Sequence, residues 1–169
     1  MTSLLIDHNF VATWSTQYTI GEREQVLLTM VGPEAKSTGY LTKDQLVDIA
    51  RWKSQRATSR IAANSPGEVE AFTRLAFEAP AYLRHRVLCC LSGVRIPMAS
   101  AILTVVFPDT YTVYDVRATN TLQAAGYTQT DGYWSYVDLC QGIATKIGTD
   151  LRTLDRALWA WDRARSRAR

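Results

Sequence analysis

The sequence predicts an all-α fold, for three reasons. Apolar residues recur at helical spacing, as in Leu151, Leu154 and Leu158, whereas the period-2 alternation typical of strands is nearly absent. Helix-start signals recur along the chain. Glycines and prolines separate segments of helical length. With 169 residues, the chain is long enough for one hydrophobic core, so we expect a single helical domain over residues 1–169.

The first half of the chain contains four expected helices. Thr42 and Gln45 have the spacing of a capping box and open a helix over 42–63. Ser65, followed by Pro66 and Glu68, opens the next helix, which ends near residue 78. Pro80 begins a helix that extends to 91. Residues 1–40 give weaker signals, with a helix over 22–30 and a break at the following Gly-Pro pair.

The second half begins with a break at Ser92 and Gly93, after which Pro97 opens an apolar helix that ends at the Pro-Asp pair 108–109. Residues 112–114 are expected to be extended, and Asp115 takes the N-cap position of a helix over 116–125. Gly126 ends that helix. Two further helices are expected over 134–147 and 151–167.

Composition excludes several classes of protein. Hydrophobic residues make up 47% and charged residues 21%, as in a soluble globular protein, and no apolar run has the ~20 residues that span a bilayer. The N-terminus lacks the pattern of a signal peptide, so we expect a cytoplasmic protein without membrane contact. The three cysteines, Cys89, Cys90 and Cys140, are expected to be buried reduced thiols. Together with two distant histidines they form no zinc or iron–sulfur pattern, so we expect no metal and no cofactor.

Positive charge is concentrated away from the N-terminus. Residues 1–50 carry three basic and six acidic groups, whereas residues 51–117 carry nine and five. This asymmetry fits a molecule with one phosphate-facing side, and therefore a nucleic-acid partner. The alternative is a solvated surface whose 15 arginines against 4 lysines reflect coding bias.

The most informative stretch runs from Leu91 to Leu103, Leu-Ser-Gly-Val-Arg-Ile-Pro-Met-Ala-Ser-Ala-Ile-Leu. It resembles the helix-hairpin-helix pattern L-x-G-hydrophobic-G-x-x-x-A. In such a hairpin the first N–H groups of the second helix point outward, where they and the helix dipole can hold a DNA phosphate. Gly93, Val94 and Arg95 form the expected DNA-contacting turn, and the small Ala99 permits close helix crossing.

The continuation Val113-Tyr114-Asp115-Val116-Arg117 strengthens the resemblance. Over about residues 85–125 the chain is similar to the HhH-GPD superfamily of DNA base-excision glycosylases, in a small bacterial branch that lacks an iron–sulfur cluster. The resemblance implies that Asp115, at the family's interval from Gly93, is the catalytic carboxylate. An ionised acid there stabilises the positive charge that develops on deoxyribose and orients the attacking water. The structural alternative for Asp115 is a helix N-cap, and the two roles are compatible.

Further residues are expected around this segment. A flipped base needs aromatic walls, for which the candidates are Trp52, Tyr111, Tyr114 and Trp134. Basic residues cluster between 51 and 60, where Lys53 and Arg56 are expected on phosphates, and Arg117 is a further DNA-binding candidate. The alternative is a solvated helix face with Trp52 in the core.

Two residues depart from the family pattern. Arg95 replaces the second hairpin glycine, a position that often needs a left-handed or tight backbone, so we expect either a cost for arginine or an additional phosphate contact. Pro97 stands where lyase-competent members carry a Schiff-base lysine. The resemblance therefore implies a monofunctional glycosylase, which removes the base without cutting the strand.

Other charged and titratable residues have structural expectations. His85 is expected on a helix surface, because nothing in the sequence pairs it with a partner. The two acids of the last expected helix are expected to form ion pairs along it, Asp155 with Arg152 or Arg156 and Asp162 with Arg165 or Arg167.

Two other interpretations remain open at this point. One is a non-catalytic helix-hairpin-helix module that binds DNA or a protein, and the other is an enzyme that acts on a nucleoside or another small molecule.

Overall fold

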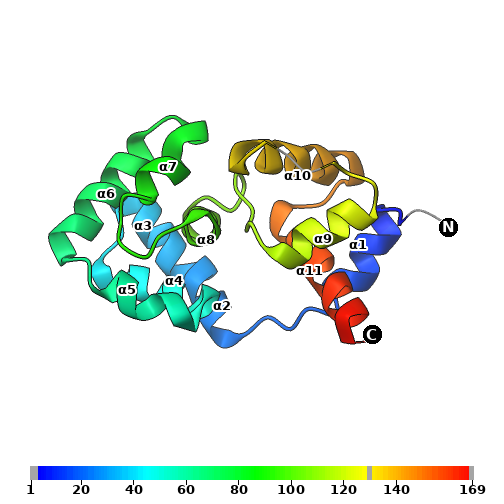
Figure 1. The fold of residues 1–169 in the computed structure, drawn as a ribbon, viewed down its shortest axis with the longest axis horizontal. Helices are drawn as coiled ribbons and strands as arrows, with labels where there is room; N and C mark the ends of the chain where they lie inside the picture. Colours follow the sequence, from blue (N-terminus) through cyan, green and yellow to red (C-terminus); the bar gives the residue numbers. More distant parts are fainter. Residues whose placement is uncertain (1–3, 129–130, 168–169) are drawn as a thin grey trace. The chain divides into compact units, whose positions relative to one another are not determined.

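The computed structural model describes residues 4–128 and 131–167. Most of these residues are helical and no strand occurs among them, which confirms the expected all-α class (Figure 1). No helix in these ranges is long and apolar enough to cross a membrane. The chain divides into two compact units: residues 1–19 with 109–169 form unit 1, and residues 20–108 form unit 2.

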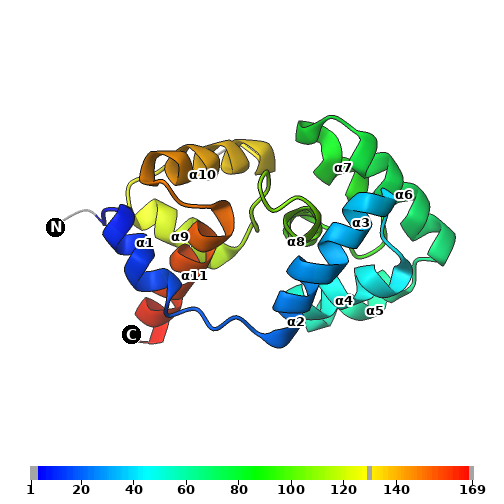
Figure 2. The ribbon, with the colours of Figure 1, turned by 180° about the vertical axis from the view of Figure 1, so that it is seen from behind.

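Unit 2 is built around one apolar helix, α8 (Ile96–Val106), which Figure 2 shows among the other helices of the unit. Every residue of α8 from Met98 to Val106 is buried. A helix that is apolar on all sides requires neighbours on all sides. Here α3 (Gly32–Thr38), α4 (Lys43–Lys53) and α7 (Arg84–Leu88) pack against it. The core of unit 2 therefore surrounds the helix that follows the predicted hairpin turn.

The capping signals in unit 2 are confirmed. Thr42 and Gln45 form a reciprocal capping box at the start of α4, with N···O distances of 2.9 and 3.3 Å. Ser65 and Glu68 do the same for α6 (Pro66–Glu78), at 2.7 and 3.2 Å. Each box satisfies N–H groups that a helix start leaves without an intrahelical partner.

Two expected helices in unit 2 have the wrong extent. The helix over 42–63 is interrupted where Ser54 adopts an extended conformation (φ −163°, ψ 108°). It resumes as a 3₁₀ turn, Gln55–Ala57, and α5 (Thr58–Ala62). The helix from Pro80 begins as a 3₁₀ turn, Ala81–Leu83, and its α-helical part, α7, ends at Leu88.

The Gly-Pro pair 32–33 does not break the chain as expected. After α2 (Glu22–Val26), a π-helical turn over Leu27–Val31 leads directly into α3. Proline cannot donate the usual backbone hydrogen bond, and the wider π turn accommodates the missing donor. Gly32 also lies against α8, where a Cβ atom would be 2.0 Å from the Val105 carbonyl oxygen. Tertiary packing therefore keeps this segment helical.

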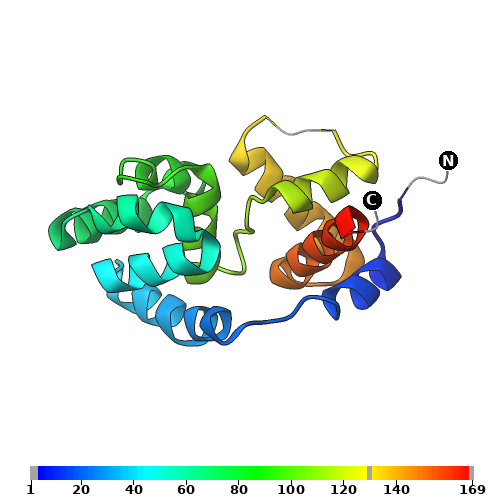
Figure 3. The same cartoon turned by 60° about the horizontal axis from the view of Figure 1, so that its bottom comes forward.

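Unit 1 combines both ends of the chain (Figure 3). The helix α1 (His8–Ser15), which the sequence pattern does not predict, is capped by Asp7, which accepts from the Phe10 N–H at 2.8 Å. It packs against α11 (Leu151–Arg167), which also packs against α9 (Val116–Ala124). The remaining helix, α10 (Tyr133–Ile147), contacts α11 as well.

Two burial expectations need correction. His85 is buried, with 5% of its surface exposed, and does not lie on the helix surface as expected. Burial lowers the pKa of its imidazole, and the nearby positive charge of Arg86 lowers it further. Among the three free cysteines Cys140 is buried, with its pKa raised to about 12 by burial, but Cys89 is half-buried and Cys90 exposed. The α-helix before Cys89 and Cys90 ends at Leu88, so these two residues lie in the turn that follows it.

Candidate nucleic-acid interface and carboxylate

The turn between α7 and α8 requires a glycine at position 93. Gly93 has a left-handed backbone (φ 78°), and a Cβ atom there would lie 2.9 Å from both Arg60 Cβ and Ile61 Cγ1. Both the conformation and the space favour glycine. Val94, next in the turn, is buried, and its N–H donates to the Leu91 carbonyl at 3.2 Å. Its side chain anchors the turn in the core of unit 2.

Asn64 holds this turn from another part of the chain. Its Oδ1 accepts from the Ser92 N–H at 2.8 Å, and its Nδ2 donates to the Ser92 carbonyl at 3.0 Å. The same Nδ2 donates to the Ile61 carbonyl at 2.9 Å, which ties the turn to the end of α5. Sequence patterns do not identify this buried asparagine, because nothing local connects it to a loop 28 positions away.

Arg95 occupies the N-cap position of α8 in an extended conformation (φ −115°, ψ 175°). The expected left-handed or tight backbone at this position is therefore wrong. Gly93 makes the left-handed turn, and the chain is already extended at Arg95, where any residue fits. Pro97 has no N–H to be satisfied. The start of α8 has no side-chain cap among the residues that the structure describes.

An open hollow of about 750 Å³ lies in front of this turn. Four basic side chains line it, together with Ser92, Gly93 and Pro97 and without any acidic residue: Lys53, Arg56, Arg60 and Arg95. The break at Ser54 produces this arrangement, because the chain turns between α4 and α5 at the rim of the hollow. We call it the hairpin basic hollow. It brings together four predicted DNA-contacting residues, Lys53, Arg56, Gly93 and Arg95.

Asp115, in unit 1, caps α9 as its sequence position predicts. The residue is extended (φ −131°, ψ 141°) and half-buried, and its Oδ1 accepts from the Arg117 N–H at 2.9 Å. The following residue, Val116, is 70% exposed. The carboxylate therefore stands at the N-terminus of α9, next to the backbone N–H groups of its first turn.

Side chains of α10 fix the extended segment that leads to Asp115. The Tyr133 hydroxyl donates to the Thr112 carbonyl at 2.8 Å, and the Tyr136 hydroxyl donates to the Val113 carbonyl at 3.1 Å. Burial raises the pKa of both phenols well above the ordinary value, so they remain neutral donors. The Gln141 amide adds a third bond, to the Thr110 carbonyl at 2.8 Å. In the sequence, only the aromatic residues of α10 hint that this helix holds the segment before Asp115.

Arg117 is engaged within unit 1. Its guanidinium lies 3.0 Å from an Asp162 carboxylate oxygen and stacks over Trp159, with its central carbon 5.6 Å from the ring centroid. Asp162 also accepts from the Asn120 amide at 3.3 Å. Asp162 is therefore paired across helices, and the expected pairing with arginines farther along α11 is wrong. The expected pair of Asp155 with Arg152 is confirmed.

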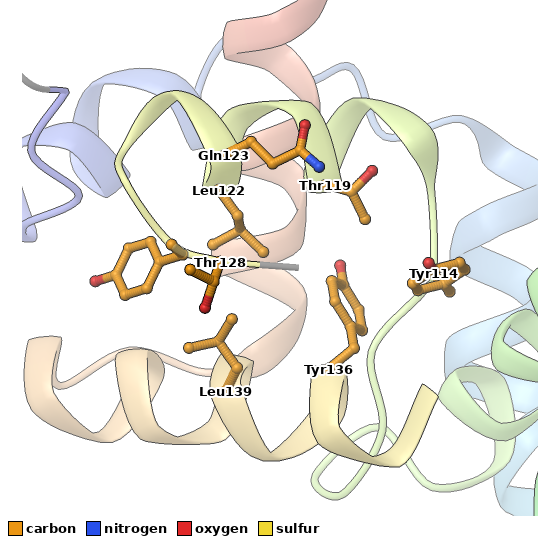
Figure 4. Close-up of a pocket in the computed structure, with 8 residues that line it drawn as sticks. Tyr114, Thr119, Leu122, Gln123, Thr128, Tyr136 and Leu139 are labelled. Carbon is orange, nitrogen blue, oxygen red and sulfur yellow. The ribbon is translucent and has the colours of Figure 1, made fainter. Parts of the chain in front are cut away.

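The predicted aromatic walls have different surroundings. Tyr111 is fully buried, edge-to-face with Trp134 at 6.1 Å between ring centroids. Tyr114 packs edge-to-face on Tyr136 at 5.0 Å and lines a hollow between α9 and α10 (Figure 4). Trp52 belongs to α4 in unit 2 and is half-buried.

The hollow beside Tyr114 is small. It is lined by aromatic, aliphatic and polar side chains, and the space in it that is accessible to water is about 20 Å³, roughly one water molecule. As it stands it admits no nucleobase.

Among the described residues, no three histidine, cysteine, aspartate or glutamate side chains lie close enough together to hold a metal ion. In comparisons with protein-family models, curated proteins and solved structures, no match to the chain was found.

Proposed function

We propose that the protein is a DNA-binding protein that removes a damaged or modified base as a monofunctional glycosylase. The observation that carries the proposal is the hairpin basic hollow, where four cations and the uncapped start of α8 surround a glycine turn. Cationic side chains and free backbone N–H groups are the groups that hold DNA phosphates. The hollow contains no acid that would repel a strand.

Asp115 supplies the proposed chemistry. Hydrolysis of an N-glycosidic bond builds positive charge on the sugar, which an adjacent carboxylate stabilises while it orients the attacking water. Three hydrogen bonds from α10 hold the segment before Asp115, which keeps the carboxylate in a fixed position. Pro97 provides no amine for an imine, so the product is an abasic site in an intact strand.

The test is base release from duplex and single-stranded oligonucleotides that carry a panel of modified bases. Alkali then converts any abasic site to a strand break. We expect alkali-labile product from the wild type and a decrease of about 10²-fold or more in Asp115→Asn. Asparagine is also a good N-cap, so this variant keeps the helix start.

The matched control is Asp109→Asn, which makes the same chemical change at an exposed turn residue. It should release base as the wild type does. Equal product from wild type and Asp115→Asn would remove Asp115 from the mechanism. Absence of product from the wild type on every substrate would reject the glycosylase.

A non-catalytic DNA-binding module is the second candidate. It is favoured by the size of the hollow beside Tyr114, which has room for about one water molecule and not for a base. The same panel separates the two candidates, because a module retains affinity for DNA and releases no base from any oligonucleotide.

A further inference from the structure

Unit 1 carries a second group of cations, on the C-terminal half of α11. Arg163 is half-exposed, and Arg165 and Arg167 are exposed. The side chain of Arg117, on the neighbouring α9, is 34% exposed. We call these four residues the α11 basic surface. None of them belongs to the hairpin basic hollow, which is lined by residues of unit 2.

Aromatic rings hold three of these guanidinium groups. Arg163 stacks over Trp159 with its central carbon 5.0 Å from the ring centroid, on the ring that Arg117 also contacts. Arg165 stacks over Trp161 at 5.2 Å. A guanidinium that lies on a ring keeps N–H groups at its edge for a phosphate. Stacking also restricts the side chain before a ligand arrives, which reduces the entropic cost of binding.

Among the acidic residues nearby, Asp162 neutralises one of the four cations of this surface, Arg117. The helix α9 contains no acid, and the two acids of α11, Asp155 and Asp162, are buried. Asp162 binds Arg117 and Asp155 binds Arg152, so each carboxylate is already engaged inside unit 1. The exposed charge at this end of α11 is therefore positive.

Polar groups suited to a nucleic-acid strand adjoin the cations. A hollow of about 470 Å³ between α9 and α11 is lined by Asn120, Gln123, Ala124, Asp162, Arg165 and Ser166. The Asp162 carboxylate in this lining is paired with Arg117. Most hydrogen bonds from proteins to DNA reach phosphates and sugars, and amide, hydroxyl and guanidinium side chains make them. We propose that the α11 basic surface binds the sugar-phosphate backbone of DNA, as a contact separate from the hairpin basic hollow.

The apolar residues of α11 argue against a lipid surface as the partner. A helix that lies on a membrane presents an apolar face to the lipid. The apolar face of α11 is buried against unit 1, and none of the exposed large hydrophobic residues in the described chain lies on α11. DNA, which would be bound through charged and polar groups, fits this surface better than a membrane does.

The test measures affinity for a short labelled DNA duplex by fluorescence anisotropy across a range of salt concentrations. The variant is Arg163→Gln/Arg165→Gln/Arg167→Gln in the full chain. We expect affinity to fall about tenfold at low salt. The slope of log affinity against log salt should become shallower by about 0.9 for each phosphate that the variant no longer neutralises.

The control is Arg23→Gln/Lys36→Gln/Lys146→Gln, which removes the same charge from exposed positions elsewhere. Equal affinity and equal salt slope in the two triple variants would overturn the proposal. So would a decrease confined to binding of anionic phospholipid vesicles, which would assign the surface to a membrane.

The proposal is separable from the function of the hairpin. Combination of the α11 substitutions with Arg56→Gln and Arg95→Gln should lower DNA affinity further, because the two surfaces bind independently. If only the hairpin substitutions weaken binding, the α11 surface does not bind DNA and the hairpin proposal stands. If only the α11 substitutions weaken binding, the hairpin basic hollow does not bind DNA and the proposal for the α11 basic surface stands.

Discussion

At the scale of single residues, two glycines determine how closely backbone segments approach in unit 2. Gly93 turns the chain in a left-handed conformation against Ile61, and Gly32 brings α3 against the backbone of α8. The hairpin motif identifies Gly93 in the sequence. The local pattern at Gly32 predicts the end of a helix instead, because a Gly-Pro pair carries no information about the distant Val105 carbonyl.

Substitution of Gly32 tests this packing. A Cβ atom at position 32 would lie 2.0 Å from the Val105 oxygen, so Gly32→Ala forces the backbones apart. We expect a decrease of about 3 kcal/mol in the free energy of unfolding, measured with urea. Gly67→Ala is the control, because nothing lies within 4 Å of its added Cβ and it is helical. A similar decrease in both variants would show that the close approach of α3 and α8 does not require glycine.

His85 makes stability depend on pH. Burial and the Arg86 charge lower its pKa in the folded protein, whereas the unfolded chain titrates near the ordinary value of 6.5. As pH falls below that value the unfolded state binds more protons, so this contribution to stability decreases until the pH reaches the folded pKa. Urea unfolding between about pH 7.5 and 5.5 should show a smaller decrease in stability for His85→Gln than for the wild type. Equal decreases would refute this role of His85.

At the scale of elements, hydrogen bonds across helices fix the segment that carries Asp115. Tyr133 and Tyr136 donate from α10 to two buried carbonyls of residues 112 and 113. Removal of a buried donor leaves its carbonyl unsatisfied. The start of α9 is therefore held by core hydrogen bonds that helix periodicity alone does not predict.

Replacement of each tyrosine by phenylalanine tests this support. Tyr133→Phe and Tyr136→Phe should each lower the free energy of unfolding by about 1–3 kcal/mol, because each leaves a buried carbonyl without its donor. Tyr82→Phe removes a hydroxyl at a 54% exposed position and should change stability by less than ~0.5 kcal/mol. Chemical denaturation measures all three. Equal stability of the core variants and the wild type would contradict the role of these bonds.

The elements that sequence patterns predict well are those with local signals. Capping boxes at Thr42 and Ser65, and the extended entry to Asp115, depend on neighbouring residues and are confirmed. The interruption of the helix at Ser54 is not predicted from the sequence, because the polar, basic stretch around Ser54 is also compatible with a continuous helix. The π-helical turn before Pro33 accommodates the missing proline N–H and also contacts α8, and the local sequence pattern shows nothing of that contact.

At the scale of the whole molecule, the chain forms two units, and the first is assembled from both of its ends. The sequence pattern does not predict that α1 packs against α11, because these helices lie at opposite ends of the chain. Separate motifs predict the basic residues 53, 56 and 95 as DNA contacts, and the structure places all three around one hollow. The aromatic residues expected around a flipped base are divided between the units.

The DNA affinity of the hairpin basic hollow tests the central claim most directly. We would measure binding of a short duplex by the wild type and by Arg56→Gln/Arg95→Gln across a range of salt concentrations, with Arg23→Gln/Lys36→Gln as the charge-matched control. We expect weaker binding by the hairpin variant and a salt slope shallower by about 0.9 for each phosphate that it no longer neutralises. A wild type that does not bind DNA, or a hairpin variant that binds as tightly as the control, would contradict the claim.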